Sequence, residues 1–209
     1  MQAQLRGNTR GFSLIELMVA LTIFSIVMLV GVGTLLTLID ANGKAQALSS
    51  AMTNLSFAFD SMTRNIRTGK DHYCVSGTSL EESTLPEAGL VRDCGAGSSN
   101  NAIVFTPGFA TSTRIAYRLN ETGDVGVIEQ WIDKVAQPDS WIPITSAEPP
   151  AAVDVDSFEL VVVDTENTES GDYAQPNISL IITGTVQNGL DTPTEFELQS
   201  EVTQRVLNF

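Results

Sequence analysis

One long apolar stretch near the N-terminus decides most of what this chain can fold into. From Leu17 to Ile39 the sequence has 23 consecutive uncharged residues, most of them apolar. About 20 such residues are enough to cross the hydrocarbon core of a bilayer as an α-helix. Residues 1–11 contain two arginines and no acid, so we expect this basic segment to stay in the cytoplasm.

A single acid, Glu16, precedes the uncharged stretch. A carboxylate inside an apolar helix costs on the order of 2.5–3.5 kcal/mol at the centre of a bilayer, and less toward the interface. No Lys, Arg or His occurs between Phe12 and Asp40, so this segment contains nothing that neutralises the charge. We therefore expect Glu16 to find a cationic partner elsewhere.

An apolar N-terminal segment is also compatible with two simpler kinds of protein. One carries a cleaved secretory signal peptide, since Ala45-Gln46-Ala47 has a small-x-small pattern. The apolar region of such a peptide would measure about 7–15 residues, however, and here Asp40 and Lys44 also separate the apolar stretch from that site. The second kind is an uncleaved single-pass anchor with an incidental glutamate, and it predicts an intact N-terminus.

The hexapeptide Gly11-Phe12-Ser13-Leu14-Ile15-Glu16 resembles the class III signal of type IV prepilins and type II secretion pseudopilins. The resemblance implies that a prepilin peptidase/methyltransferase cuts between Gly11 and Phe12 and then methylates the new terminal amine of Phe12. It also implies a partner for Glu16, namely the freed amine of Phe12 on a neighbouring subunit. Such a salt bridge would relieve the charge penalty that each isolated subunit carries and would fix the register of packed helices.

The same resemblance implies a structural subunit of a type IV pilus or a type II secretion pseudopilus. From the residues themselves we expect no catalytic residues, cofactor or metal. Arg114–Leu119 and Gln204–Asn208 look like segments of the larger minor subunits of this family, the J-type or W-type. The alternative is a filament-tip adhesin or substrate-docking module. Secretion, adhesion or motility, and DNA uptake all use this kind of N-terminus.

The resemblance also implies a location and a set of partners. The chain would first lie in the bacterial inner membrane as a single-pass protein, with its leader in the cytoplasm and its head outside. It would then enter the filament. Its partners would be the prepilin peptidase, other pilin or pseudopilin subunits and the inner-membrane assembly platform.

Apolar residues continue at helical spacing beyond Ile39, in steps of three and four. They are Ala45, Leu48, Met52, Leu55, Phe59, Met62 and Ile66, and the opposite face carries Lys44, Gln46, Asn54, Ser61 and Arg64. We predict a helix from Phe12 to Thr68 that stops at Gly69, with a transmembrane half over residues 12–39 and an amphipathic half over 40–68. Gly31, Gly33 and Gly43 weaken this helix, which permits either bending during assembly or close packing.

Strand signals dominate the region that follows a predicted loop at residues 71–101. Short apolar or alternating runs occupy residues 102–106, 115–119, 125–132, 158–163 and 178–186. In the last segment Phe196, Leu198, Val202 and Val206 alternate with Glu195, Glu197, Glu201 and Arg205, which is typical of a half-buried antiparallel strand. We therefore predict an α+β, pilin-like fold, in which the amphipathic half-helix covers one sheet face of a β-rich head spanning residues 69–209.

The charge of the chain argues against one class of partner. The net charge is −14, and residues 71–209 alone contain 5 basic and 22 acidic side chains. Nucleic-acid binding normally uses a basic patch that releases counterions. We expect no general nucleic-acid binding by the acidic head.

Cys74 and Cys94 are the only cysteines, 20 positions apart in a Gly- and Ser-rich region. In an oxidising compartment they would form a loop-closing disulfide, worth roughly 3 kcal/mol from loop entropy. Unpaired thiols are an alternative, and a metal site with His72 is another, although three ligands at this spacing match no zinc motif. We interpret His72 as a loop residue beside Cys74.

The sequence contains no recognisable enzyme motif. A chain with one histidine cannot supply a paired metal-binding helix motif, and no nucleophile-elbow or phosphate-loop sequence occurs. The acids of residues 154–172 offer calcium ligands in principle, but they do not follow the EF-hand pattern. They are Asp154, Asp156, Glu159, Asp164, Glu166, Glu169 and Asp172.

Overall fold

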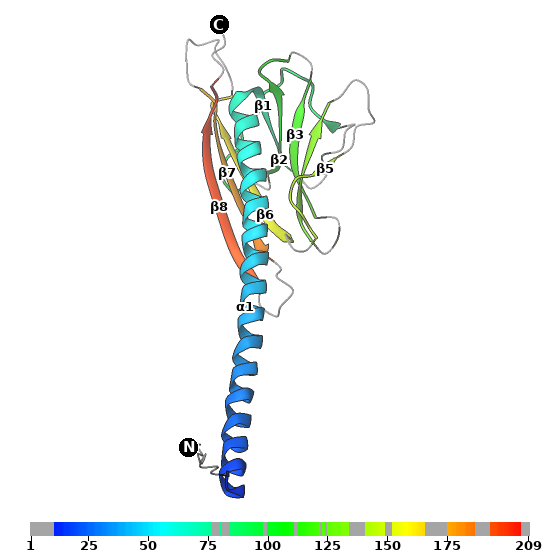
Figure 1. The fold of residues 1–209 in the computed structure, drawn as a ribbon. Coiled ribbons are helices and arrows are strands. Elements are labelled where there is room, and N and C mark those ends of the chain that lie inside the picture. The colour runs from blue at the N-terminus through cyan, green and yellow to red at the C-terminus, as the bar shows by residue number, and fades with distance from the viewer. Residues whose placement is uncertain are drawn as a thin grey trace, which may run out of the picture. The chain divides into compact units, whose positions relative to one another are not determined.

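The computed structural model describes residues 11–76, 80, 84–97, 100–110, 113–121, 123, 125–133, 141–148, 152–165, 175–186 and 193–205. These residues form one α-helix and eight β-strands (Figure 1). The chain divides into two compact units, Met1–Gly43 and Lys44–Phe209. The predicted α+β class, with a long N-terminal helix followed by antiparallel sheets, is confirmed. Most of the predicted leader, residues 1–10, lies outside the described residues.

Helix α1 runs from Leu14 to Thr68, so it starts two residues later than predicted. Ser13 caps it, because its Oγ accepts a hydrogen bond from the backbone N–H of Glu16 at 3.3 Å. The helix ends before Gly69, as predicted. A Cβ at Gly69 would lie only 2.5 Å from Cδ2 of Phe105, so the close approach of the chain to Phe105 requires glycine there.

The first sheet has five antiparallel strands in the order β1-β2-β3-β4-β5, which is also their order along the chain. The strands are β1 (Gly69–Ser76), β2 (Asn100–Pro107), β3 (Ile115–Asn120), β4 (Val127–Ile132) and β5 (Ile142–Pro143). Strand β2 is buried on both faces over Ala102–Phe105. Its apolar residues are therefore consecutive rather than alternating.

The second sheet has three antiparallel strands in the order β6-β7-β8. They are β6 (Val153–Val163), β7 (Asn177–Val186) and β8 (Thr194–Thr203). The predicted alternation in β8 is confirmed, since Phe196 and Val202 are buried whereas Glu195 and Glu197 are exposed. Val206 lies outside the described residues.

The second half of α1 packs into a core shared by both sheets. The predicted stripe is confirmed at Leu55, Met62 and Ile66, which are buried. The prediction for Ala45 was wrong, because this residue is exposed. Ala51 and Ala58 are buried in its place, and a small side chain there lets the helix backbone approach the core closely.

Two polar residues predicted on the solvent face of α1 are half-buried instead. They are Asn54 and Ser61. The Oδ1 atom of Asn54 accepts a hydrogen bond from the backbone N–H of Ser146 at 3.1 Å. Polar contacts such as this one hold the helix in register against the sheet in addition to the apolar contacts.

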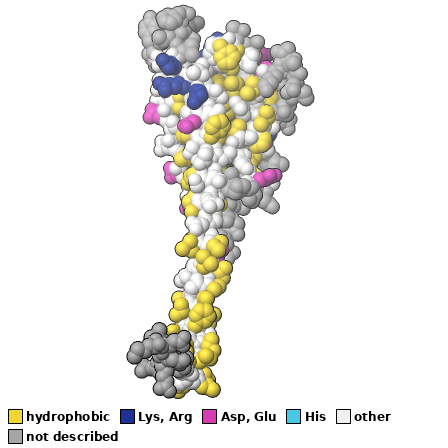
Figure 2. Space-filling view, in the orientation of Figure 1, with side chains coloured by type: hydrophobic (Ala, Val, Ile, Leu, Met, Phe, Trp, Pro, Cys, Tyr) yellow, Lys and Arg dark blue, Asp and Glu magenta, His cyan; other side chains and the backbone are white. Residues whose placement is uncertain are grey.

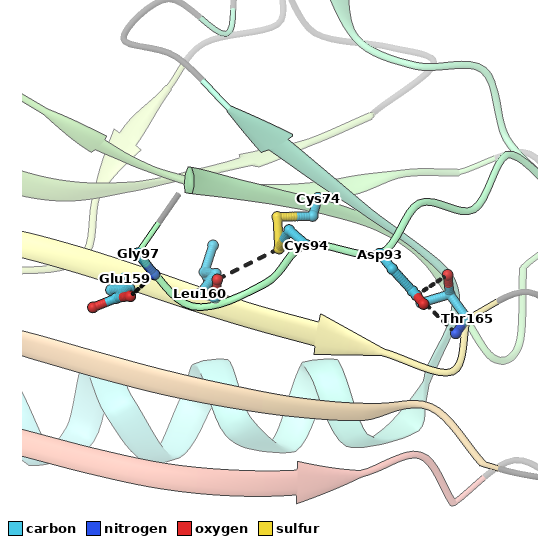
Figure 3. Close-up of a disulfide and its surroundings, with 7 residues drawn as sticks. All are labelled: Cys74, Asp93, Cys94, Gly97, Glu159, Leu160 and Thr165. Atoms are coloured by element: carbon cyan, nitrogen blue, oxygen red, sulfur yellow. Dashed lines mark hydrogen bonds between the residues drawn. A yellow bond between two sulfur atoms is a disulfide. The ribbon is translucent and has the colours of Figure 1, made fainter. Parts of the chain in front are cut away.

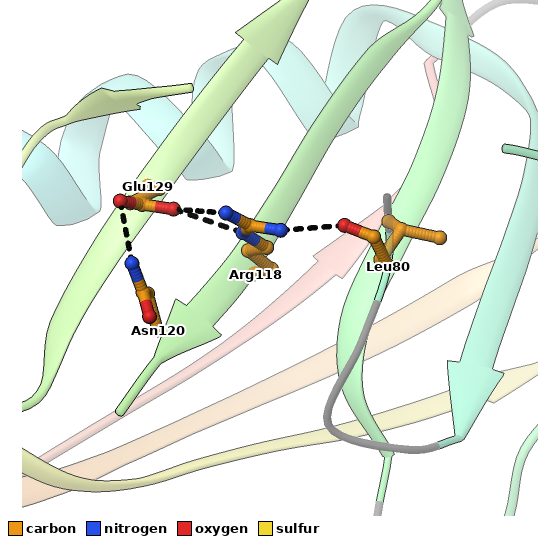
Figure 4. A network of polar contacts seen from close by, with 4 residues as sticks. All are labelled: Leu80, Arg118, Asn120 and Glu129. Carbon is orange, nitrogen blue, oxygen red and sulfur yellow. Dashed lines mark hydrogen bonds and ion pairs between the residues drawn. The ribbon is translucent and has the colours of Figure 1, made fainter. Parts of the chain in front are cut away.

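A second apolar cluster lies on the other face of the first sheet, where Leu80 and Leu85 cover Val104 and Trp131. Arg118 connects this cover to the sheet (Figure 4). Its Nε and Nη2 atoms each lie 2.8 Å from Oε2 of Glu129, and its Nη1 donates to the carbonyl oxygen of Leu80 at 2.6 Å. Arg118 thus ties the covering segment to β3 and β4.

The prediction of a loop over residues 71–101 was wrong for its first part. Residues 71–76 belong to β1, which pairs with β2. The register of this pairing shifts between Lys70 and Tyr73, and Asp71 there has a φ of 57°. His72 is consequently a buried strand residue, 1% exposed, and not a loop residue.

Candidate functional site

Three exposed residues precede the first turn of α1. Gly11, Phe12 and Ser13 are not helical, and Phe12 is 82% exposed. A Cβ added at Gly11 would meet no atom within 4 Å. Packing against the described residues therefore leaves room for a side chain at Gly11.

Glu16 lies in the first turn of α1 and is exposed. Ser13 and Glu16 have the spacing of a capping box, Ser-x-x-Glu, and the positive end of the helix dipole favours a carboxylate there. The sequence contained this signal, but the prediction considered only a distant cationic partner for Glu16. No ion pair joins Glu16 to another residue in the part of the chain that the structure describes.

The first half of α1 presents apolar side chains on every side. All residues of this helix up to Gln46 are exposed. An 18-residue stretch of the helix has a mean hydropathy of 2.5. Figure 2 shows apolar side chains along the visible face of this part. By length and composition α1 is able to cross a membrane. A helix from the interior of a soluble protein would be mostly buried, and this half of α1 is not.

The N-terminal segment of the chain matches the prokaryotic N-terminal methylation motif over residues 6–32. No curated protein and no solved structure matches the chain. The chain therefore combines a pilin-like α+β fold, with an apolar N-terminal helix and antiparallel β-sheets, with a cleavage and methylation signal that extends into this helix. Its signal is that of the type IV pilin and pseudopilin family, whose members are structural proteins and not enzymes.

The matched motif implies processing by a prepilin peptidase. Together with the apolar helix, it indicates an inner-membrane protein that later joins a filament.

Cys74 and Cys94 form a disulfide, with an S–S distance of 2.08 Å and Cα atoms 6.0 Å apart (Figure 3). This is the first of the alternatives that the sequence left open. His72 points elsewhere, since its Nε2 lies 3.0 Å from the carbonyl oxygen of Ile66. Within the described ranges no group of three His, Cys, Asp or Glu residues is placed to hold a metal ion.

The disulfide holds a short segment, Arg92–Cys94, that connects the two sheets. On one side the N–H of Cys74 donates to the carbonyl of Arg92 at 3.1 Å, and the N–H of Arg92 donates to that of His72 at 3.1 Å. On the other side Cys94 exchanges backbone hydrogen bonds with Val162 in β6. The sequence did not predict this connection, because a three-residue segment is too short to show a periodic pattern of apolar residues.

Asp93 fixes the same segment against the end of β6 (Figure 3). Its carboxylate accepts hydrogen bonds from the backbone N–H of Thr165 at 2.9 Å and from the hydroxyl of Thr165 at 2.5 Å. The N–H of Asp164, a residue with a φ of 60°, donates to the same carboxylate at 3.2 Å. The segment is thus bonded to both sheets and to the turn that follows β6.

Two of the acids considered as calcium ligands bind backbone amides instead. Asp154 accepts a hydrogen bond from the N–H of Gly126 at 2.8 Å, and Glu159 accepts one from Gly97 at 2.8 Å. Glu166, Glu169 and Asp172 lie outside the described residues. Asp154 and Glu159 therefore serve the connections of the head.

Proposed function

We propose that this protein is a structural subunit of a type IV pilus or a type II secretion pseudopilus, and specifically a minor subunit. The observation that carries the proposal is the methylation motif over residues 6–32, which coincides with the non-helical Gly11 and Phe12 and with an exposed apolar helix. Prepilin peptidase cuts between Gly11 and Phe12, and the amine of Phe12 is then methylated. The helix subsequently packs among the helices of other subunits.

The proposed contact between Phe12 and Glu16 of a neighbouring subunit has a simple electrostatic basis. Cleavage creates an ammonium group one residue before the cap of α1, where the positive end of the helix dipole disfavours a cation. A carboxylate from a neighbour compensates this charge, and the attraction is strong where water is excluded. Support comes from Glu16, which is exposed and has no ion pair to any other described residue.

The proposed function assigns a role to each segment of the chain. Residues 1–11 are the leader, residues 12–39 the membrane and assembly half of the helix, residues 40–68 its amphipathic half, and residues 69–209 the head outside the membrane. The inner-membrane assembly platform and the other pilin or pseudopilin subunits are the partners. The burial of α1 supports an exposed first half and a packed second half, because its buried residues begin at Ala51.

Mass analysis of the N-terminus tests the proposal. The mature protein isolated from its native membrane should begin at Phe12 and should be about 14 Da heavier than the unmodified product, the mass of one added methyl group. Replacing Gly11 with Leu should leave the leader in place, whereas Gly7→Leu should be processed normally. An isolated protein that still begins at Met1 would refute the proposal, because it would be a plain membrane anchor.

A further inference from the structure

The end of α1 and the end of β8 line a groove of about 570 Å³. Its lining includes three arginines, namely Arg64 and Arg67 from the helix and Arg205 from the residues after β8. Arg64 and Arg67 are three positions apart and therefore lie on the same face of α1, and the backbone N–H of Arg205 donates to the carbonyl oxygen of Arg67 at 2.9 Å. The fold thus brings three arginines to one place, and Figure 2 shows basic side chains close together on the visible face.

The three arginines have no counter-ion among the described residues. All three are exposed, and none forms an ion pair with another described residue. Each guanidinium group presents five N–H donors in a planar fork that fits the two oxygens of a carboxylate or a phosphate. The groove therefore offers donors for an oxyanion, in a chain whose net charge is −14.

The uncharged part of the described lining is polar and rich in hydroxyl groups. It contains Thr63, Thr68, Ser200 and Thr203, and its apolar residue is Val202. None of the described lining residues is aromatic, so this lining lacks the ring faces on which proteins stack unpaired nucleic-acid bases. It also provides no apolar wall for an acyl chain. Such a lining favours a ligand that combines an anionic group with several hydroxyl groups.

Two acids of the groove, Asp60 and Glu201, oppose a bare anion but suit an anion that also carries hydroxyl groups. A carboxylate accepts hydrogen bonds from hydroxyl groups, and its charge strengthens them. Glu201 already accepts a hydrogen bond from Asn177 at 2.5 Å. Asp60 is exposed and forms no ion pair with a described residue, so its carboxylate is available to a hydroxyl group of a ligand.

We propose that the groove binds an anionic sugar, with the arginines on its carboxylate or phosphate group and Asp60 on its hydroxyl groups. The volume of about 570 Å³ lies in the range of small-molecule sites, about 300–1,000 Å³, so the groove has room for a sugar ring as well as its charged group. Arginine forks fit carboxylate and phosphate alike, so the charged group is an oxyanion of either kind. This inference goes beyond the proposed function, because assembly of a structural subunit requires no such ligand.

The negative charge of the head permits a small anion but disfavours a polyanion. Charges in water are largely screened from each other beyond about 8 Å at physiological salt, so a ligand with one or two charges responds mainly to the groove itself. The described charged residues there are three arginines and two acids. A long acidic polymer would also cover surface outside the groove, where residues 71–209 carry 22 acids and 5 bases. The ligand is therefore a single anionic sugar unit, free or at the end of a glycan.

Titration of the full chain in detergent micelles with five small molecules tests this site, with ligand-observed NMR as the measurement. Glucuronate and glucose 6-phosphate carry an oxyanion on a sugar, glucose lacks the charge, and acetate and inorganic phosphate lack the sugar. At least one of the two anionic sugars should bind at least about tenfold more tightly than glucose and than its own bare anion, a difference of about 1.4 kcal/mol. The inference fails if neither anionic sugar binds, or if glucose or the bare anion binds equally well.

Substitutions in the groove locate the binding. Arg64→Gln with Arg205→Gln should weaken binding of the anionic sugar at least about tenfold, because hydrogen bonds to charged groups are worth at least that factor. The control Lys44→Gln with Arg92→Gln removes the same charge from exposed residues outside the groove and should leave binding unchanged. Asp60→Ala should reduce the preference for the anionic sugar over the bare anion, because it removes a hydroxyl acceptor together with a charge that repels both ligands.

Binding that survives the arginine substitutions, or that the control loses to the same extent, would overturn the assignment to this groove. Fluorescence of Trp131, which is 1% exposed, checks that each variant retains the fold of the wild type. The mass of the N-terminus does not enter this test. A loss of the sugar site therefore leaves the proposed function intact, and an uncleaved leader leaves the sugar site intact.

Discussion

The backbones of Cys94 and Val162 exchange two hydrogen bonds, at 2.8 Å and 2.9 Å, in an isolated antiparallel bridge. Val162 belongs to the three-stranded sheet, whereas the disulfide partner of Cys94, Cys74, belongs to the five-stranded sheet. The covalent bond therefore acts on the segment that connects the two sheets. Without the disulfide, backbone hydrogen bonds of Arg92 with His72 and Cys74 still join that segment to β1.

Removing the disulfide should destabilise the head. For Cys74→Ser with Cys94→Ser we expect a loss of about 3 kcal/mol in the free energy of unfolding, because the unfolded chain regains the entropy of a 20-residue loop. Urea unfolding of the full chain in detergent measures this loss. The fluorescence of Trp131, which is 1% exposed, reports on the core of the head.

A reductant provides the control for the disulfide. Wild-type protein with reductant should unfold at the urea concentration of the double variant, and reductant should have no further effect on the variant. Equal stability of the oxidised wild type and the variant would show that the bridge residues hold the sheets together without the covalent bond.

His72 should make the stability of the head depend on pH. Burial lowers its pKa from the ordinary value of 6.5, and this effect outweighs the hydrogen bond to Ile66 and the nearby Asp71 carboxylate, both of which raise it. Below pH 6.5 the unfolded chain therefore binds a proton that the folded chain does not. Stability should fall as the pH drops below 6.5, by at most about 1.4 kcal/mol per pH unit from this residue.

His72→Gln separates this contribution from that of the carboxylates, because Gln keeps a hydrogen-bond donor but does not titrate. His72 is the only histidine of the chain. Urea unfolding between pH 7.5 and 5.5 should give a smaller loss of stability for the variant than for the wild type. If both proteins lost the same stability between pH 7.5 and 5.5, the buried imidazole would not resist protonation.

Truncating two nearby residues of α1 should have very different effects on the stability of the head. Leu55 is 1% exposed and belongs to the shared core, whereas Phe57 is 74% exposed. Leu55→Ala should cost about 2–5 kcal/mol, since it removes buried apolar contacts and leaves a cavity. Phe57→Ala should change the stability of the isolated protein by less than about 0.5 kcal/mol, and a loss as large as that of Leu55→Ala would contradict the described helix face.

The sequence predicted those elements in which local pattern and burial agree. Strand β8 alternates acids with apolar residues, and its burial alternates in the same way. The face of α1 followed from the spacing of Leu55, Met62 and Ile66. Ala51 and Ala58 escaped prediction, because an alanine is compatible with either face of a helix and only its neighbours decide its burial.

Strand β1 could not be recognised from its own residues. Its first half, Gly69–His72, is polar apart from the glycine, and the irregular register of the pair with β2 breaks the alternation. His72 is buried because the end of α1 and β2 surround it, with Phe105 at a ring distance of 5.7 Å. Tertiary contacts determine that these residues form a strand, and such contacts cannot be recognised in a single sequence.

Residues close together in the sequence were easier to predict as functional candidates than residues that only the fold brings together. Gly11, Phe12 and Glu16 were proposed from the sequence because their spacing forms a local motif, and the methylation motif over residues 6–32 includes their positions. The groove that Arg64, Arg67 and Arg205 line was not predicted, since Arg64 and Arg205 are 141 positions apart and only the packing of α1 beside the end of β8 brings them together.

Glu16→Gln should separate processing from assembly. The variant keeps the size of the side chain and the Ser13 cap but removes the charge that would pair with Phe12 of a neighbour. Cleavage and methylation should remain, whereas the fraction of protein in sheared filaments should fall at least about tenfold, because breaking a buried ion pair costs about 3–5 kcal/mol. Immunoblotting of sheared and cell-bound fractions measures this ratio, and the mass of the N-terminus confirms processing.

Asp40→Asn is the matched control, since it removes one exposed carboxylate from the same helix. It should be incorporated like the wild type, because Asp40 lies at the end of the apolar stretch, where water can solvate its charge. If Glu16→Gln also enters filaments normally, the pairing with Phe12 does not drive assembly, and the role of Glu16 is limited to the first turn of the helix. Loss of cleavage in the Glu16 variant would instead assign the residue to recognition by the peptidase.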